Sequence, residues 1–177
     1  METMHDLFVN EMKDLYSAEN QLIKALPKMA KAASNTSLRD AFTMHLQQTE
    51  EHARRIEEIF KAGVEGSPRG KKCAAMEGLV QEGKEVIDEG GPGDVLDAAL
   101  IGAAQRVEHY EMAGYGTARA HAQQLGYMNA ARLLQQTLDE ESAANEQLTQ
   151  IAESSINPSA AQKHDGRSAR EGMREQR

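Results

Sequence analysis

Apolar residues recur at intervals of three and four along four long segments of the chain, which is the spacing of the buried face of an α-helix. Strong helix formers (Ala, Leu, Met, Glu, Gln and Lys) dominate, and no stretch alternates convincingly between apolar and polar residues as a half-buried strand does. The chain has 177 residues, a length expected of one domain. The pattern therefore predicts an all-α protein in which long amphipathic helices pack around one core.

Turn signals divide the chain into these helices: SNTS at 34–37, GVEGSPRGKK at 63–72, EGGPGD at 89–94 and LGYMN at 125–129. Thr36 or Ser37 is the expected N-cap of the second helix, and Asp94 that of the third long helix. The long helices are expected at about 8–33, 38–62, 95–124 and 129–154, with a shorter helix at 73–89. Residues 1–155 are expected to form the bundle, and the polar residues 156–177 a disordered tail.

A short internal sequence repeat indicates how the helices are arranged. The second helix contains LQQTEEH at 46–52, and the fourth contains LQQTLDEE at 134–141. Two helical hairpins of similar plan, joined by a crossover, form a four-helix bundle with an approximate twofold axis. The short helix at 73–89 would then lie in the crossover.

Every long helix interrupts its apolar stripe with an acid or a histidine. The separation from Glu19 to His52 equals the separation from Glu108 to Glu141. In antiparallel hairpins with similar turns, equal separations bring these residues to one level of the bundle. Glu111 lies one turn from Glu108 on the same face, so the third long helix would contribute two acids.

Buried acids at close range predict a metal site. An ionised carboxylate is costly in an apolar interior unless it is paired or bound to a cation, and neighbouring carboxylates raise one another's pKa. No lysine lies on these stripes. Carboxylate oxygens with an imidazole nitrogen suit iron or manganese, and two ions bridged by glutamates fit the number of ligands. The expected ligands are Glu19, His52, Glu108, Glu111 and Glu141, with His45, Glu51 and Glu140 as second choices.

Six segments, taken together, resemble a known family. The segments are YSAENQL, CAAMEGL, DAALIGAAQRVEHYE, YGT, QLGY and LLQQTLDEE. They are similar to the ferritin-like superfamily, and more narrowly to the YciE/YciF-type bacterial stress proteins, over roughly Leu7 to Ile151. The resemblance implies a ferritin-like four-helix bundle, a dinuclear metal site and a dimer, without an established reaction.

The resemblance also extends to single positions. Glu19, Glu108 and Glu141 fit the ligands of the first, third and fourth helices of that superfamily, and Glu111 fits the extra carboxylate of rubrerythrin-like members. His52 stands where the superfamily usually has a glutamate.

Two departures from the superfamily pattern affect the expected ligand set. Arg55 and Ala144 stand where it has histidines, so both Glu-x-x-His pairs are missing. This implies either a site with fewer nitrogen ligands or a rearranged set that includes Glu51, Glu140 or His45.

Composition excludes several classes of partner. The formal net charge of −8 argues against nucleic acid or an anionic membrane as the main partner. A single cysteine, Cys73, rules out an internal disulfide and fits a reducing compartment. The first residues lack the features of a signal peptide, so a cytoplasmic location is expected. Apolar residues of the short helix and the resemblance together predict a homodimer, although these residues would equally serve to cover the bundle of their own chain; they are Met76, Leu79, Val80 and Val86.

Two functions of different class fit these observations. The first is a ferritin-like protein of the stress response that binds two divalent ions, iron or else manganese, with oxidase or peroxide-consuming activity on an unidentified small substrate. The alternative is a non-catalytic helical structural or interaction protein without bound metal. Iron storage in a closed ferritin-type shell is disfavoured by the polar tail and the crossover helix.

Overall fold

The structure, a computed structural model, describes residues 1–162, and within this range the chain forms helices and no strands. The prediction of an all-α fold is confirmed. The helices are α1 (Met4–Ala32), α2 (Thr36–Lys61), α3 (Ala74–Glu89), α4 (Gly93–Gln124), α5 (Met128–Ile151) and a short π-helical turn, η1 (Ala152–Ile156).

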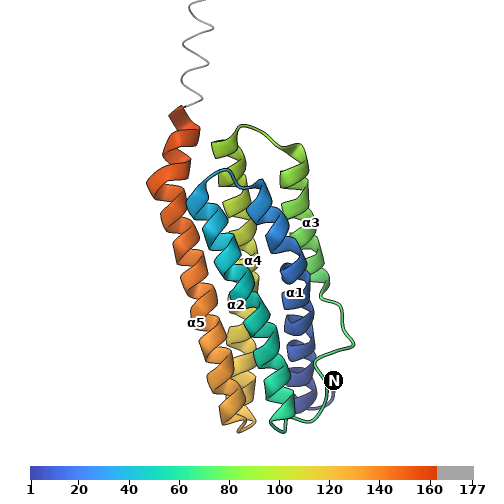
Figure 1. Ribbon diagram of the computed structural model, residues 1–177. Helices are drawn as coiled ribbons and strands as arrows, with labels where there is room; N and C mark the ends of the chain where they lie inside the picture. Colours follow the sequence, from blue (N-terminus) through green and yellow to red (C-terminus); the bar gives the residue numbers. More distant parts are fainter. Residues whose placement is uncertain (163–177) are drawn as a thin grey trace, which may run out of the picture.

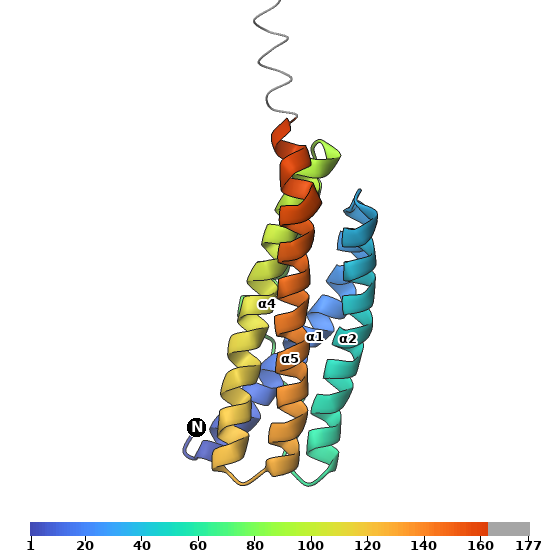
Figure 2. The ribbon, with the colours of Figure 1, turned by 90° about the vertical axis from the view of Figure 1, so that its left-hand side faces the viewer.

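The four long helices form a bundle of two antiparallel hairpins joined by a long crossover, so α2 and α4 run in the same direction (Figure 1). Helices α1 and α2 make one antiparallel hairpin, and α4 and α5 make the other (Figures 1 and 2). Further contacts join α2 to α5 and α1 to α4, so each long helix lies beside two antiparallel neighbours. The connection between the hairpins runs the length of the bundle, and α3 within it packs against α1 and α4. This is the predicted four-helix bundle with a short crossover helix.

Two of the predicted N-caps are wrong. Asn35 rather than Thr36 or Ser37 caps α2, because its side-chain oxygen accepts a hydrogen bond of 3.1 Å from the backbone N–H of Leu38. Helix α4 begins at Gly93, with Pro92 at the N-cap, so Asp94 lies inside the first turn. Proline suits a helix start because its fixed φ matches the approach and it has no N–H that needs a partner.

A buried aspartate fastens the turn between α1 and α2 to α4. Asp97 has no exposed surface, and its two carboxylate oxygens each accept a hydrogen bond of 2.8 Å, from the backbone N–H groups of Ser34 and Asn35. Both oxygens of this buried acid therefore have a partner, and the acid fixes the register between the two hairpins at one end of the bundle.

The apolar core consists of two clusters that are separated along the bundle. One includes Leu22, Phe42 and Leu100, and the other includes Phe8, Ile56 and Leu134. Between these sets the inward positions are polar, and the next section describes them.

The apolar residues of α3 pack on their own chain. Met76 is fully buried, and Leu79, Val80 and Val86 are partly buried against the bundle. The apolar face of α3 that favoured a homodimer therefore packs largely against its own chain.

Helical structure continues beyond residue 155, the predicted end of the bundle. After η1 the chain stays helical through residues 157–162. The rest of the predicted tail, 163–177, lies outside the described residues. None of the helices within 1–162 combines the length and the apolar character that crossing a bilayer requires.

Candidate metal centre

Six ionisable side chains lie together in the middle of the bundle, and each is at most 5% exposed. Helix α1 provides one, α2 two, α4 two and α5 one. They are Glu19, His45, His52, Glu108, Glu111 and Glu141. Each occupies an inward position of its helix, because the apolar residues one turn before and after it face the core. The five ligands of first choice in the sequence prediction thus lie in one place, together with His45.

The six residues form two groups that share one member. In each group the ligand atoms lie within 4.8 Å of one another. The first group is His45, Glu108, Glu111 and Glu141, and the second is Glu19, His52 and Glu141. Glu141 belongs to both groups, so its carboxylate lies where a bridge between two ions would be.

Distances between the polar atoms suit ligands that share an ion. Two ligands held about 2.1 Å from an ion at a right angle lie about 3 Å apart. His52 Nδ1 is 2.8 Å from Glu141 Oε1 and 3.5 Å from Glu19 Oε1. In the first group, His45 Nε2 is 3.4 Å from Glu108 Oε1 and 3.6 Å from Glu141 Oε2.

Most of these atoms lack a hydrogen-bond partner among residues 1–162. Ten buried side-chain nitrogen or oxygen atoms have none, and eight of them belong to the six residues. The two others belong to Arg119 and His121. Buried polar atoms without partners are rare in folded proteins because each loses its hydration without compensation. Here they lie together at one point, several of them at ion-pair distance from one another, in an arrangement that could hold a metal ion.

Both histidines are oriented by contacts on their outer ring nitrogens. His52 Nε2 lies 2.8 Å from Glu140 Oε2, and His45 Nδ1 lies 3.3 Å from Gln48 Oε1. A histidine that ligates a metal nearly always donates its other N–H to an oxygen acceptor, which fixes the tautomer and the plane of the ring. Nδ1 of His52 and Nε2 of His45 face the carboxylates. Burial opposes protonation of His52, but Glu19, Glu140 and Glu141 outweigh this and raise its pKa to about 12, so a metal ion would have to displace the proton on Nδ1.

Glu140 supports the site from outside it. Arg55 Nη1 and Nη2 donate to its two oxygens at 2.7 and 2.9 Å, a bidentate ion pair. His52 and Arg55 together lower the pKa of Glu140 to about 2, so it is an anion at all ordinary pH values. The arginine that replaces the superfamily's usual histidine thus holds an acceptor for His52.

The buried carboxyls differ in protonation. Burial, reinforced by the neighbouring acids, raises the pKa values of Glu108 and Glu111 well above their usual range, and burial also raises that of Glu19. Burial opposes ionisation of Glu141 as well, but its contacts with His52 and His45 outweigh this and lower its pKa. When ionised, the four glutamates bear four negative charges, which two divalent cations would balance.

Tyr115 donates a hydrogen bond to Glu19 Oε1 from a fully buried position. Burial and the nearby carboxylates raise the pKa of its hydroxyl, so Tyr115 remains a neutral donor. The bond fixes one oxygen of Glu19 and leaves the other, Oε2, without a partner among the described residues.

The remaining second-choice residue is outside the cluster. The side chain of Glu51 is 41% exposed and pairs with Arg54 at 2.7 Å. His45 is closer to the centre than the sequence prediction placed it. The signal for His45 is its spacing of seven residues from His52, two helical turns on one face.

A small crevice leads from the surface to the first group. It is lined by residues of α2, α4 and α5, among them His45, Glu108 and Ala144, and its free volume of about 10 Å³ is close to that of one water molecule. The crevice therefore has room for about one water molecule beside the first group.

The fold and this cluster define a class: helical bundles with a buried carboxylate and histidine centre of the ferritin-like kind. The chain belongs to the family described as domain of unknown function DUF892, which matches residues 3–161. It is 46% identical to protein YciF of Escherichia coli (strain K12) over 163 residues, 92% of this chain and 98% of that protein.

Two solved structures have the same fold. The crystal structure of the E. coli stress protein YciF matches with a TM-score of 0.86 at 46% identity, and covers 89% of this chain and 99% of that one. YcfI of Rhodopseudomonas palustris, for which a structural role has been suggested, matches with a TM-score of 0.82 at 42% identity, and covers 86% and 96%. The predicted resemblance to YciF-type proteins is confirmed.

Proposed function

We propose that this chain binds two divalent metal ions, iron or else manganese, in the buried centre, and acts in the stress response as an oxidase or a peroxide-consuming protein. The observation that most supports the proposal is the set of eight buried polar atoms without partners on six converging side chains. Four carboxylates and two imidazoles are donors that iron and manganese accept. The relative described as a stress protein supports the physiological setting.

Different residues of the chain would bind the ions, orient the ligands and exclude water. His45, Glu108 and Glu111 would hold one ion, and Glu19 and His52 the other, with Glu141 between them. Bound iron or manganese would supply electron transfer to a small oxidant. Arg55 and Glu140 would keep His52 in the ligating tautomer, and Tyr115 would hold Glu19 in position. The apolar clusters on either side of the centre would exclude bulk water from it.

Elemental analysis of protein purified without chelator tests this proposal. About two iron or manganese ions per chain are expected for the unmodified protein, and a Glu108→Ala variant should lose at least one of them. The iron-loaded protein should also consume added hydrogen peroxide faster than the Glu108→Ala variant does. Absence of bound metal, both as purified and after anaerobic loading with Fe(II), would contradict the proposal.

A non-catalytic structural or interaction role without metal is the second candidate, and the structural role suggested for YcfI favours it. In this case, replacing Glu19 and Glu108 by glutamine would leave thermal stability unchanged or raised in every buffer. A metal protein would instead lose the stabilisation that the bound ions confer.

A homodimer and a cytoplasmic location remain predictions of this proposal. The dimer rests on the family resemblance, since the apolar face of α3 is largely used within the chain. Sedimentation at several concentrations tests it: a single species of about twice the chain mass of 19.4 kDa is expected.

A further inference from the structure

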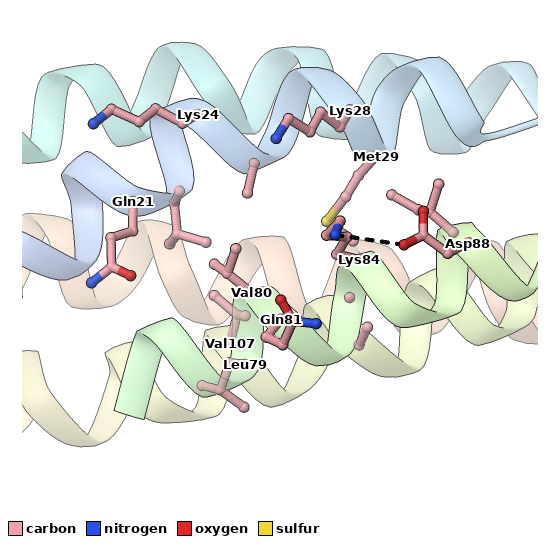
Figure 3. Close-up of a pocket in the computed structure, with 15 residues that line it drawn as sticks. Gln21, Lys24, Lys28, Met29, Leu79, Val80, Gln81, Lys84, Asp88 and Val107 are labelled. Carbon is pink, nitrogen blue, oxygen red and sulfur yellow. Dashed lines mark ion pairs between the residues drawn. The ribbon is translucent and has the colours of Figure 1, made fainter. Parts of the chain in front are cut away.

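An apolar cavity lies outside the metal centre, between the crossover helix α3 and the bundle. It has a volume of about 220 Å³ and lies between α3, α1 and α4 (Figure 3). Its interior is formed by aliphatic side chains and methionine, of which the main ones are Leu22, Met29, Val80, Ile87, Ala103 and Val107. An apolar cavity of about 150 Å³ is enough to bind benzene, so this one has room for a short aliphatic chain.

Small residues keep the cavity open. Gly83 lies in the middle of α3, where glycine costs about 1 kcal/mol relative to alanine. Close packing does not require it, because a Cβ at this position would meet only the Cβ of Ala103, at 4.0 Å. A larger residue would fit the backbone and fill the space. The glycine therefore preserves a cavity at the expense of helix stability.

Positive charge gathers at the mouth of this cavity. Lys24 and Lys28 project from α1 on one side, and Lys84 projects from α3 on the other (Figure 3). All three are exposed. Lys84 pairs with Asp88 at 3.7 Å, whereas Lys24 and Lys28 form no ion pair with any residue in 1–162. This local excess of lysine is notable in a chain whose formal net charge is −8.

We infer that the cavity binds a free anionic amphiphile, a molecule with a short aliphatic chain and a carboxylate or similar head group. The chain would lie in the apolar interior along α3, and the head group would lie at the mouth between Lys24, Lys28 and Lys84. Aliphatic surface and uncompensated positive charge are both present, and an amphiphilic anion is complementary to both. The inference is independent of the metal centre, since none of the six centre residues lines this cavity.

Isothermal titration calorimetry with monomeric sodium octanoate and decanoate tests the inference. Binding of one molecule per chain is expected, with affinity rising about fourfold for each added methylene until the cavity is filled. Decyltrimethylammonium, which has the same tail and the opposite charge, should bind at least tenfold more weakly than decanoate. Equal affinity for the two head groups, or no binding of decanoate, would overturn the inference.

Two variant pairs locate the site. The double variant Lys24→Gln/Lys28→Gln should weaken decanoate binding about tenfold, while Lys13→Gln/Lys31→Gln, which removes the same charge from the same helix outside the cavity, should not. Gly83→Leu should abolish binding by filling the cavity.

Gly78→Leu, on the exposed side of α3 with open space around the position, is the control for Gly83→Leu and should bind normally. If Gly83→Leu does not fold, as judged by circular dichroism, the surface lysine variants still decide the question. Normal binding by the Lys24→Gln/Lys28→Gln variant would overturn the inference.

Other occupants give different results. If a second copy of the chain covers the cavity, Gly83→Leu will change the sedimentation coefficient and decanoate will dissociate a dimer. If the face docks on a bilayer, the protein will float with phosphatidylglycerol vesicles and bind no monomeric decanoate. Either result would contradict a site for a free amphiphile.

Discussion

Oε1 of Glu141 lies 2.8 Å from Nδ1 of His52, yet neither atom has a hydrogen-bond partner among the described residues. The two groups form a buried ion pair, because the pKa of His52 is raised to about 12 and that of Glu141 is lowered. A bound cation would take the place of the proton on Nδ1 and keep both atoms as ligands. The other oxygen of Glu141 faces His45 at 3.6 Å, so this one carboxylate connects the two halves of the centre.

Replacing Glu141 should therefore damage both halves of the centre, and replacing Glu19 only one. We expect Glu141→Ala to weaken binding of both Mn(II) ions by at least about tenfold, and Glu19→Ala to leave one ion bound normally. Calorimetric titration with Mn(II) measures this, with Glu146→Ala, an exposed acid on the same helix, as control. Identical losses in Glu141→Ala and Glu19→Ala would contradict the bridging position.

Glu111→Gln should have opposite effects on the stability of the metal-free and metal-bound proteins. Both oxygens of Glu111 are buried without partners, and burial with neighbouring acids raises its pKa. Folding must protonate this acid, and glutamine avoids that cost, so the change should stabilise the metal-free protein at pH 7 by about 1–3 kcal/mol, a rise in Tm of several degrees. The same change removes a ligand, so added Mn(II) should raise Tm less than in the unmodified protein.

Thermal melts with and without Mn(II) check this prediction for Glu111. Glu146→Gln, an exposed acid on α5, should behave like the unmodified protein under both conditions. A lower Tm for metal-free Glu111→Gln would mean that burying this acid does not destabilise the metal-free bundle.

Asp14, which lies outside the metal centre, should make a pH-dependent contribution to the free energy of unfolding. Its burial opposes ionisation, but Cys73, Tyr110 and Lys71 outweigh this and lower its pKa below the ordinary 3.8. Lys71 Nζ lies 2.9 Å from its carboxylate. An acid with a lowered folded-state pKa stabilises the fold above the unfolded-state pKa, and the contribution is lost as pH falls through the folded-state value.

Asp14→Asn should accordingly destabilise the protein by about 1–2 kcal/mol at pH 7. The difference from the unmodified protein should shrink below about pH 4. Urea denaturation across this range measures it. Asp88→Asn, an exposed partner of Lys84, should show a much smaller effect. A difference that stays constant with pH would exclude an electrostatic role for Asp14.

Two glycines of α4 provide a matched test of how closely α1 and α4 approach. A Cβ at Gly114 would lie 2.7 Å from Leu15 Cδ2, whereas a Cβ at Gly116 would meet nothing within 4 Å. Gly114→Ala should destabilise the bundle by about 1–3 kcal/mol through overpacking. Gly116→Ala should stabilise it by up to about 1 kcal/mol through helix propensity. Denaturation midpoints decide, and a stabilising Gly114→Ala would show that the helices are not fixed at this separation.

Helix periodicity was sufficient to predict the bundle and most of the centre. Glu19, His52, Glu108 and Glu141 lie on the inward stripes of four separate helices, and equal spacing in the two hairpins predicts a common level. The structure places them, with Glu111, in one cluster. Periodicity identifies which face of a helix a residue occupies and how far along the bundle it lies. The prediction that these residues meet required only these two properties.

Features that depend on three-dimensional neighbours were not predictable in the same way. His45 shares the face of His52, but the sequence does not determine that it reaches Glu108 on α4 and Glu141 on α5. The bidentate pair of Glu140 with Arg55 joins α5 to α2, and sequence spacing does not determine that contact. The N-cap at Asn35 was missed because Asn35, Thr36 and Ser37 are all good capping residues.

The central claim is that the buried centre binds two metal ions. The most direct test is an anaerobic equilibrium titration of the metal-free protein with Fe(II), in which calorimetry or absorption detects binding. If the eight unpartnered atoms are metal ligands, the titration should saturate at two ions per chain, and binding should release protons from Glu108 and Glu111. Saturation at zero ions, or equal binding by a variant in which Glu108, Glu111 and Glu141 are all alanine, would contradict it.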